Sequence, residues 1–162
     1  ATRHIPIKDL PKYFTKQAVE DAIDLGIDFL ETLGIKNKRI GICGFNPHAG
    51  EDGYNGKEEI EILQPVMNLL KYQKIKFIGP VSGDALFHKA ENNEIDLIIA
   101  NYHDQGIFPL KAMDYFGCVN ITVGLPFVRV SPGHGTAFDI AGKNIANPQA
   151  MIEAILWSLN MK

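Results

Sequence analysis

Cysteine is scarce in this chain of 162 residues, and long hydrophobic runs are absent. Only Cys43 and Cys118 occur, far apart and outside any Cys-x-x-Cys spacing, so the sequence carries no pattern of a cysteine-based zinc site. Both lie in strand-like apolar runs, where a buried, reduced thiol is expected, as suits a cytoplasmic protein. No apolar stretch approaches the roughly 20 residues that span a bilayer, which argues against a membrane protein.

An excess of charge of one sign is also missing. The 16 Lys and Arg residues against 19 Asp and Glu residues leave a net charge of -3, and no basic stripe stands out, which argues against binding to nucleic acid. Apolar residues make up 46% of the chain, as in an ordinary globular domain with a sizeable core. The chain opens without an initiator methionine, so we expect it to be a piece of a longer protein.

Helical and strand-like segments alternate along the chain, which predicts an α/β fold: a mostly parallel, mixed sheet between helices, in three αβα layers. The predicted strands are 39–43, 75–78, 96–100, 119–123 and 127–130. The predicted helices are 15–32, 57–72, 108–115, 135–141 and 148–161, together with a short helix that begins at 82 or 84 and ends at 90. We assign residues 1–148 to a metal- and substrate-binding α/β domain, and residues 149–162 to a C-terminal helix that packs on a further domain.

Three histidines lie in segments that proline or glycine interrupts: His4 in Thr-Arg-His-Ile-Pro, His48 in Asn-Pro-His-Ala-Gly-Glu and His103 in Tyr-His-Asp-Gln-Gly. Two of them follow apolar strand-like runs, and ligand sites of α/β folds form where strands end. Neutral imidazoles are common ligands of divalent metals, and three of them leave a coordination position open for a substrate. We therefore predict an open, catalytic metal site. The alternative is that all three are hydrogen-bonded loop histidines.

Other polar residues suggest contacts to a substrate. Asp104 can orient an imidazole or accept a substrate hydroxyl, or else cap the helix that follows. Asp84 can bind a polar substrate group, and a helix cap is the alternative. Asn120 and Arg129 lie in apolar stretches, where a buried amide or cation needs a partner, and with Lys111 they can fix a phosphate or carboxylate. For Lys111 the alternative is a solvated helix face.

Four long motifs give the chain a family resemblance. They are the runs 44–51 (Gly-Phe-Asn-Pro-His-Ala-Gly-Glu), 102–106 (Tyr-His-Asp-Gln-Gly), 119–129 and 134–137 (His-Gly-Thr-Ala). In this order they resemble 4-hydroxythreonine-4-phosphate dehydrogenases of pyridoxal phosphate (vitamin B6) biosynthesis. The resemblance covers essentially the whole chain, but only the C-terminal half of that family's chain. It implies a fold like that of isocitrate and isopropylmalate dehydrogenases.

The resemblance also implies roles for individual residues. It assigns a divalent metal, zinc first and magnesium or cobalt as alternatives, to His4, His48 and His103. It assigns the phosphorylated hydroxy-amino acid to Asp84, Lys111, Asn120 and Arg129, with Lys111 and Asp104 as the candidate catalytic residues. It assigns the adenine side of NAD or NADP to the glycine-rich stretch with His134, Gly135, Thr136, Ala137 and Asn147. By composition alone, that stretch is an ordinary loop.

The implied reaction is oxidation of 4-hydroxythreonine 4-phosphate by hydride transfer to NAD, followed by decarboxylation, in a homodimer whose active site takes residues from both subunits. Alternative substrates are phosphorylated four-carbon sugar acids or aromatic cis-dihydrodiols. Two further alternatives are a metal-free phosphate acyltransferase and a non-catalytic fragment that only binds metal. One departure from the family pattern is Arg3, which stands where the family usually has threonine beside the first histidine.

Overall fold

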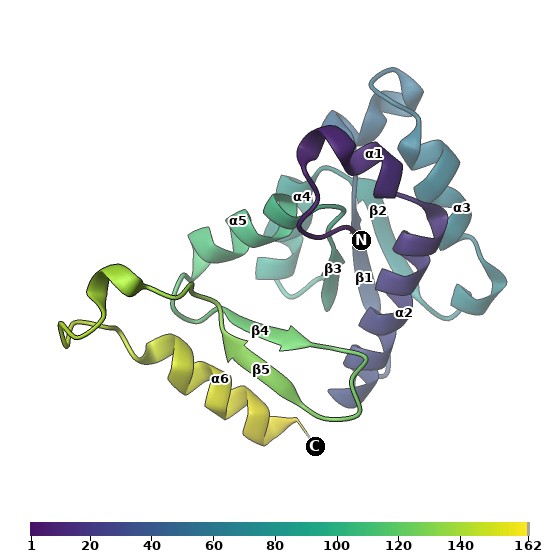
Figure 1. Ribbon diagram of the computed structural model, residues 1–162. Coiled ribbons are helices and arrows are strands. Elements are labelled where there is room, and N and C mark those ends of the chain that lie inside the picture. Colours follow the sequence, from purple (N-terminus) through teal and green to yellow (C-terminus); the bar gives the residue numbers. More distant parts are fainter. Residues whose placement is uncertain (162) are drawn as a thin grey trace. The chain divides into compact units, whose positions relative to one another are not determined.

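The computed structural model describes residues 1–161 and divides into two compact units, Ala1–Ile107 and Phe108–Lys162, with the division inside helix α5 (Figure 1). Each unit has its own sheet. Both cysteines are free thiols in buried positions. Across residues 1–161, no helix combines the length and the apolar character needed to cross a membrane.

The first unit is built on three parallel strands, as the alternation of elements predicts. Strand β1 (Arg39–Cys43) lies between β2 (Lys76–Val81) and β3 (Leu97–Ile99). Side chains alternate along β1, so Ile40 and Ile42 point to one face of the sheet and Cys43 to the other. All three side chains are fully buried, and this places the core on both faces of the sheet.

Helix α2 (Lys16–Thr32) covers the first face, where its buried residues pack with Ile40 and Ile42 (Figure 1). Thr15 caps its N-terminus by accepting a hydrogen bond from the Ala18 amide at 3.2 Å. Gly34 ends it with a left-handed φ of 77°, and the Ile35 amide donates to the Leu30 carbonyl at 2.9 Å. The sequence therefore predicts both ends of this helix correctly.

Helix α4 (Gly83–Glu91) covers the opposite face through Leu86, which packs with Cys43 and Ile95. A Cβ on Gly41 would lie 3.0 Å from the Leu86 side chain, so a larger residue at this strand position would require Leu86 and Ile95 to shift. The three-layer αβα arrangement that the sequence predicts is therefore present in this unit.

Two predicted helices have different bounds in the structure. The segment 57–72 is broken into a widened π-helical stretch at Glu59–Leu63, helix α3 (Gln64–Met67) and a 3-10 turn at Leu70–Tyr72. Pro65 has no amide hydrogen to donate, and this interrupts the regular helical ladder.

Two short elements precede α2, a 3-10 turn at Ile7–Asp9 and helix α1 (Leu10–Tyr13).

Helix α5 (His103–Met113) begins five residues before the predicted start at 108. Asp104 falls in its first turn, where a carboxylate is favourable beside the free amides of a helix N-terminus. Pro109 consequently lies in the helix interior rather than in the first turn.

The second unit contains an antiparallel hairpin of β4 (Val119–Thr122) and β5 (Arg129–Pro132), against which helix α6 (Gln149–Asn160) packs. The prediction of a helix at 135–141 is wrong: only a 3-10 turn at Phe138–Ile140 forms. Left-handed φ angles at Ala137 (50°) and Gly142 (75°) bound this turn and prevent a longer helix.

One ion pair ties the starts of two strands together and makes stability depend on pH. The Asp96 carboxylate accepts hydrogen bonds from the Arg39 amide (2.8 Å), Nε (3.0 Å) and Nη2 (2.6 Å). These contacts with Arg39 hold the pKa of Asp96 below its ordinary value. A lowered pKa contributes stability that is present above the unfolded pKa of about 3.9 and is lost as pH falls through the folded pKa.

We therefore expect Asp96→Asn to lower the free energy of unfolding by about 2 kcal/mol at pH 7, because hydrogen bonds to a charged group are lost. Urea unfolding at a series of pH values measures this. The difference from the wild type should shrink as pH falls below about 4, where the unfolded carboxylate begins to bind a proton, and should continue to shrink through the lower folded pKa of Asp96. A difference that stays constant down to pH 2 would show that the carboxylate charge contributes nothing.

Candidate functional site

His103 is the first residue of α5 and follows the C-terminal end of β3, so it lies in the first helical turn rather than in the predicted loop. Its side chain is 42% exposed, and Nδ1 lies 2.7 Å from Asp104 Oδ1. A carboxylate only accepts, so Nδ1 carries the proton and Nε2 is the free nitrogen of the neutral ring. Asp104 thus orients the His103 imidazole, as a partner of a metal ligand does.

His4 lies beside His103. The two rings have centres 5.2 Å apart and are tilted by 42°. Two hydrogen bonds to the Asn101 carbonyl, from the Thr2 amide (2.9 Å) and hydroxyl (2.7 Å), hold the segment that precedes His4. His4 itself has a left-handed φ of 56°. The structure therefore brings two of the three predicted metal ligands together.

Two amide side chains connect this region to β1. Asn101 is fully buried and donates from Nδ2 to the Cys43 carbonyl at 2.7 Å. Gln105 Oε1 accepts from the Asn101 amide at 2.8 Å, and its Nε2 donates to the Gly44 carbonyl at 2.7 Å. Gln105 lies within the 102–106 motif, but neither charge nor motif patterns single out Asn101. The signal in the sequence is the position of Asn101, a polar residue that directly follows the predicted strand 96–100.

His48 lies in a separate, left-handed turn at Pro47–Gly53, and its side chain is exposed. Asp84 lies in the first turn of α4, and the Ser82 hydroxyl, then the Ala85 amide and most weakly His48 lower the pKa of its carboxylate. Within residues 1–161, no three or more His, Cys, Asp or Glu side chains are grouped to hold a metal ion. The three predicted ligands therefore do not form one complete site in a single copy of the chain.

The pair of His4 and His103 nevertheless fits a metal. Zinc binds an imidazole nitrogen at about 2.0–2.1 Å, so two rings on one tetrahedral ion have centres about 5 Å apart. The observed 5.2 Å agrees with that separation. Both side chains are exposed, so each ring can present a nitrogen to a metal without disrupting the packing of the core. The spacing of the two rings therefore fits two ligands of one metal ion.

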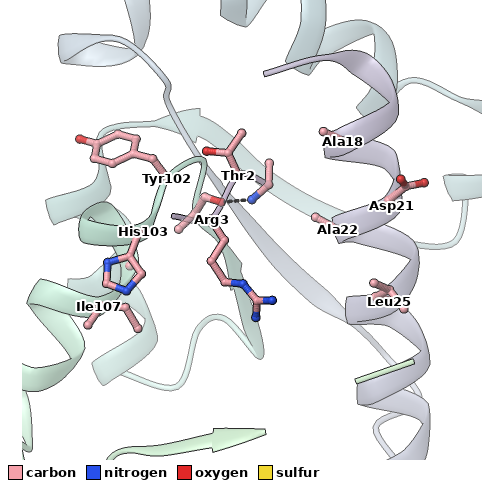
Figure 2. A pocket seen from close by; sticks show the side chains of 12 residues that line it. Thr2, Arg3, Ala18, Asp21, Ala22, Leu25, Tyr102, His103 and Ile107 are labelled. Carbon is pink, nitrogen blue, oxygen red and sulfur yellow. Dashed lines mark hydrogen bonds between the residues drawn. The ribbon is translucent and has the colours of Figure 1, made fainter. Parts of the chain in front are cut away.

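A pocket of about 480 Å³ is lined by His103 of this pair. Figure 2 shows the Arg3 side chain between His103 and Ile107 on one side and α2 on the other. On α2, Asp21 and Leu25 line the pocket opposite Arg3. The cation that departs from the family pattern thus lies at the wall of a cavity, in a volume typical of small-molecule sites.

The predicted phosphate-binding residues lie in the second unit. Asn120 pairs with Ser131 across the hairpin, and Thr122 pairs with Arg129, so all four share one face. Arg129 Nη1 donates to the Thr122 hydroxyl at 2.7 Å. The prediction of a buried amide is wrong, because the Asn120 side chain is exposed on this two-stranded sheet. Lys111 lies on α5, with Nζ 5.2 Å from the centre of the Tyr115 ring.

The predicted cofactor stretch is exposed throughout. His134 Nδ1 lies 2.9 Å from the Gly135 carbonyl oxygen, and a Cβ on Gly135 would meet nothing within 4 Å. Thr136 and Ala137 follow, the latter in a left-handed conformation. Asn147 has a local role, since its Oδ1 accepts from the Gln149 amide at 2.9 Å at the start of α6. The backbone of this stretch is accessible to a ligand.

These features agree with the relationship of the chain to known proteins. The family described as "Pyridoxal phosphate biosynthetic protein PdxA" matches residues 1–158. The chain belongs to this family. Among curated PdxA-type relatives, the 4-hydroxythreonine-4-phosphate dehydrogenase of Sulfurihydrogenibium sp. is 43% identical over 162 residues, which are 99% of this chain and 50% of that protein.

Two further comparisons concern the fold and a relative with a different name. The crystal structure of 4-hydroxythreonine-4-phosphate dehydrogenase from Klebsiella pneumoniae matches with a TM-score of 0.87 and 36% identity, over 99% of this chain and 49% of that one. A protein of Halalkalibacterium halodurans, provisionally named D-threonate 4-phosphate dehydrogenase, is 44% identical over 154 residues, 95% of this chain and 46% of that protein. The chain thus has the PdxA fold and spans about half the length of its relatives.

Proposed function

We propose that the chain forms half of a metal- and NAD-dependent dehydrogenase that oxidises and decarboxylates 4-hydroxythreonine 4-phosphate. The observation that carries the proposal is the pair of His4 and His103, with ring centres 5.2 Å apart, in a chain of the PdxA family. Zinc is the first candidate for the metal, and magnesium and cobalt are alternatives. When bound, the metal supplies a Lewis acid for the hydroxyl group, and the nicotinamide accepts the hydride.

The residues of the first unit would orient the reacting end of the substrate. Asp104 would orient the His103 imidazole by accepting a hydrogen bond from Nδ1, which leaves Nε2 as the nitrogen that can bind a metal. Asp84 would contact a polar substrate group as a carboxylate, since its neighbours lower its pKa. Its place near His48 supports a role beside the third proposed ligand.

The residues of the second unit would bind the anionic groups. Arg129 has a hydroxyl and no carboxylate among its contacts in the described chain, which leaves its charge available for a phosphate. Asn120 lies on the same hairpin face, and we assign Lys111 to the phosphate or to proton transfer. The exposed stretch with His134, Gly135, Thr136, Ala137 and Asn147 would contact the adenine side of the nicotinamide cofactor.

Completion of this site requires more protein than one copy of the chain. We propose a homodimer, with His48 of one subunit joining His4 and His103 of the other on one metal.

Helix α6 would pack on the half of the relatives' chain that this chain does not match. It buries Ala150 and Ala154 but exposes a large apolar set: Met151, Ile152, Ile155, Leu156 and Leu159. Both cysteines are free thiols, and on that basis we assign the protein to the cytoplasm.

D-threonate 4-phosphate is the second candidate substrate. The relative named for it is 44% identical to the chain, and the one named for 4-hydroxythreonine 4-phosphate is 43% identical, so identity favours neither. The two compounds differ at one carbon, which carries an amine in the first candidate and a hydroxyl in the second. Both carry the phosphate that Arg129 would bind.

An enzyme assay with a chelator tests the proposal. The chain would be co-expressed with the half of a curated relative that it does not match, and we call this two-part protein the reconstituted enzyme. With 4-hydroxythreonine 4-phosphate and NAD, we expect NADH formation that a chelator abolishes and zinc restores. D-threonate 4-phosphate is assayed in parallel to rank the two substrates. NADH formation that continues undiminished in the chelator would contradict the metal-dependent mechanism.

A further inference from the structure

We infer that Glu59 is a positioning residue for His48: its buried carboxylate holds the left-handed turn that presents this imidazole. The inference rests on the proposed function, because His48 is there assigned to the metal. It concerns a residue on the helical segment Glu59–Leu63, which follows the turn in the sequence. Helical spacing places Glu59 on the same face as the buried Leu63 and Val66.

Glu59 is a buried acid without a basic partner. Its exposure is 3%, and none of the ion pairs among residues 1–161 includes it. Instead, Oε1 accepts from the Asn46 amide at 2.8 Å and Oε2 accepts from Asn46 Nδ2 at 2.9 Å. A buried carboxylate is costly unless its oxygens are hydrogen-bonded. Here those bonds all go to the residue that enters the turn.

The turn itself has an unfavourable backbone. Five consecutive residues, from His48 to Asp52, have positive φ angles between 44° and 78°, and only Gly50 among them is glycine. L-residues rarely adopt this conformation, so surrounding contacts must impose it. Few apolar contacts are available, because the side chains of His48, Glu51 and Asp52 are exposed.

Glu59 contacts the turn at two points, on either side of His48. One is Asn46, and the other is Gly50, where an added Cβ would lie 2.7 Å from Glu59 Oε2. Glu58 supports the first point by accepting from Asn46 Nδ2 at 2.7 Å. By contacting the turn on both sides of His48, the Glu59 carboxylate would restrict the directions in which the turn can present the His48 side chain. Strain held at a ligand-bearing turn in this way is typical of functional sites.

Cobalt binding to the reconstituted enzyme tests the inference, because the visible absorption of bound Co²⁺ reports its ligands. Glu59→Gln keeps the shape of the side chain but places an NH₂ group against a donor of Asn46. We expect Co²⁺ to bind about 10- to 100-fold more weakly, with an altered spectrum, as for the loss of a group that orients a ligand. Glu61→Gln, an exposed acid of the same helix, is the matched control and should change affinity less than twofold.

Two further variants separate the possible failures. His48→Ala should weaken Co²⁺ binding; if it does not, His48 is no ligand and the proposed function fails with it. If His48→Ala weakens binding but Glu59→Gln matches the wild type in affinity and spectrum, only the present inference is overturned. Gly50→Ala pushes the turn away from an intact Glu59 and should reproduce the weaker binding, which gives a second reading if Glu59→Gln does not fold.

Discussion

Alanine in place of His103 is expected to remove the metal from the reconstituted enzyme and to slow NADH formation about a thousandfold. The imidazole is one of the two proposed ligands that the chain brings together, with ring centres 5.2 Å apart. Metal catalysis supplies several kcal/mol of transition-state stabilisation, and about 4 kcal/mol corresponds to three powers of ten in rate. Metal content by mass spectrometry and initial rates at saturating NAD measure the two effects.

His88→Ala is the matched control for this variant. His88 is an exposed histidine in the last turn of α4, where its ring nitrogen lies 3.3 Å from Asn92 Nδ2. Removing it should change neither the metal content nor the rate. A His103→Ala protein that contains no metal and still forms NADH at the wild-type rate would rule out the proposed mechanism.

Where local chemistry decides an element, the sequence predicts it. Thr15 and Gly34 fix the two ends of α2, and the apolar run of β1 has the bounds that the pattern predicts. Where tertiary contacts decide, the pattern is insufficient. The backbone from His48 to Asp52 is left-handed, and although histidine and aspartate adopt this conformation more often than most residues, five such residues in a row do not follow from local preferences.

The same division applies to the candidate site. Motif and context select His4 and His103, and the structure places them side by side. Neither the burial of Glu59 nor the exposure of Asn120 follows from a short sequence window. Glu59 lies four residues before Leu63, and this helical spacing indicates that it belongs to the buried face. A glutamate at that position also fits the solvent-exposed edge of the helix, so the sequence leaves both interpretations open. Asn120 is exposed on a face of the β4–β5 hairpin.

Asn101→Asp is expected to be strongly destabilising although it exchanges a single NH₂ group for oxygen. Asn101 is fully buried, and its Nδ2 donates to the Cys43 carbonyl at 2.7 Å. An ionised aspartate would place a negative oxygen against the Cys43 carbonyl oxygen. A protonated aspartate could donate to that carbonyl, but it would have to keep a proton that the carboxyl group readily gives up in water. Its other oxygen would gain nothing, since Asn101 Oδ1 has no hydrogen-bond partner among the described residues. An unpaired buried charge costs about 3–5 kcal/mol, a large share of a typical folding free energy.

The pH dependence of this loss identifies its cause. A buried aspartate has a folded pKa above the unfolded value of about 3.9, so the folded state binds the extra proton and the variant loses stability as pH rises. Urea unfolding should therefore show a larger deficit at pH 8 than at pH 5. Asn37→Asp, at an exposed position, introduces the same charge and should stay within about 0.5 kcal/mol of the wild type. Equal stabilities for the two variants would mean that Asn101 does not hold the ends of β1 and β3 together, and the pairing of His4 with His103 would then need another support.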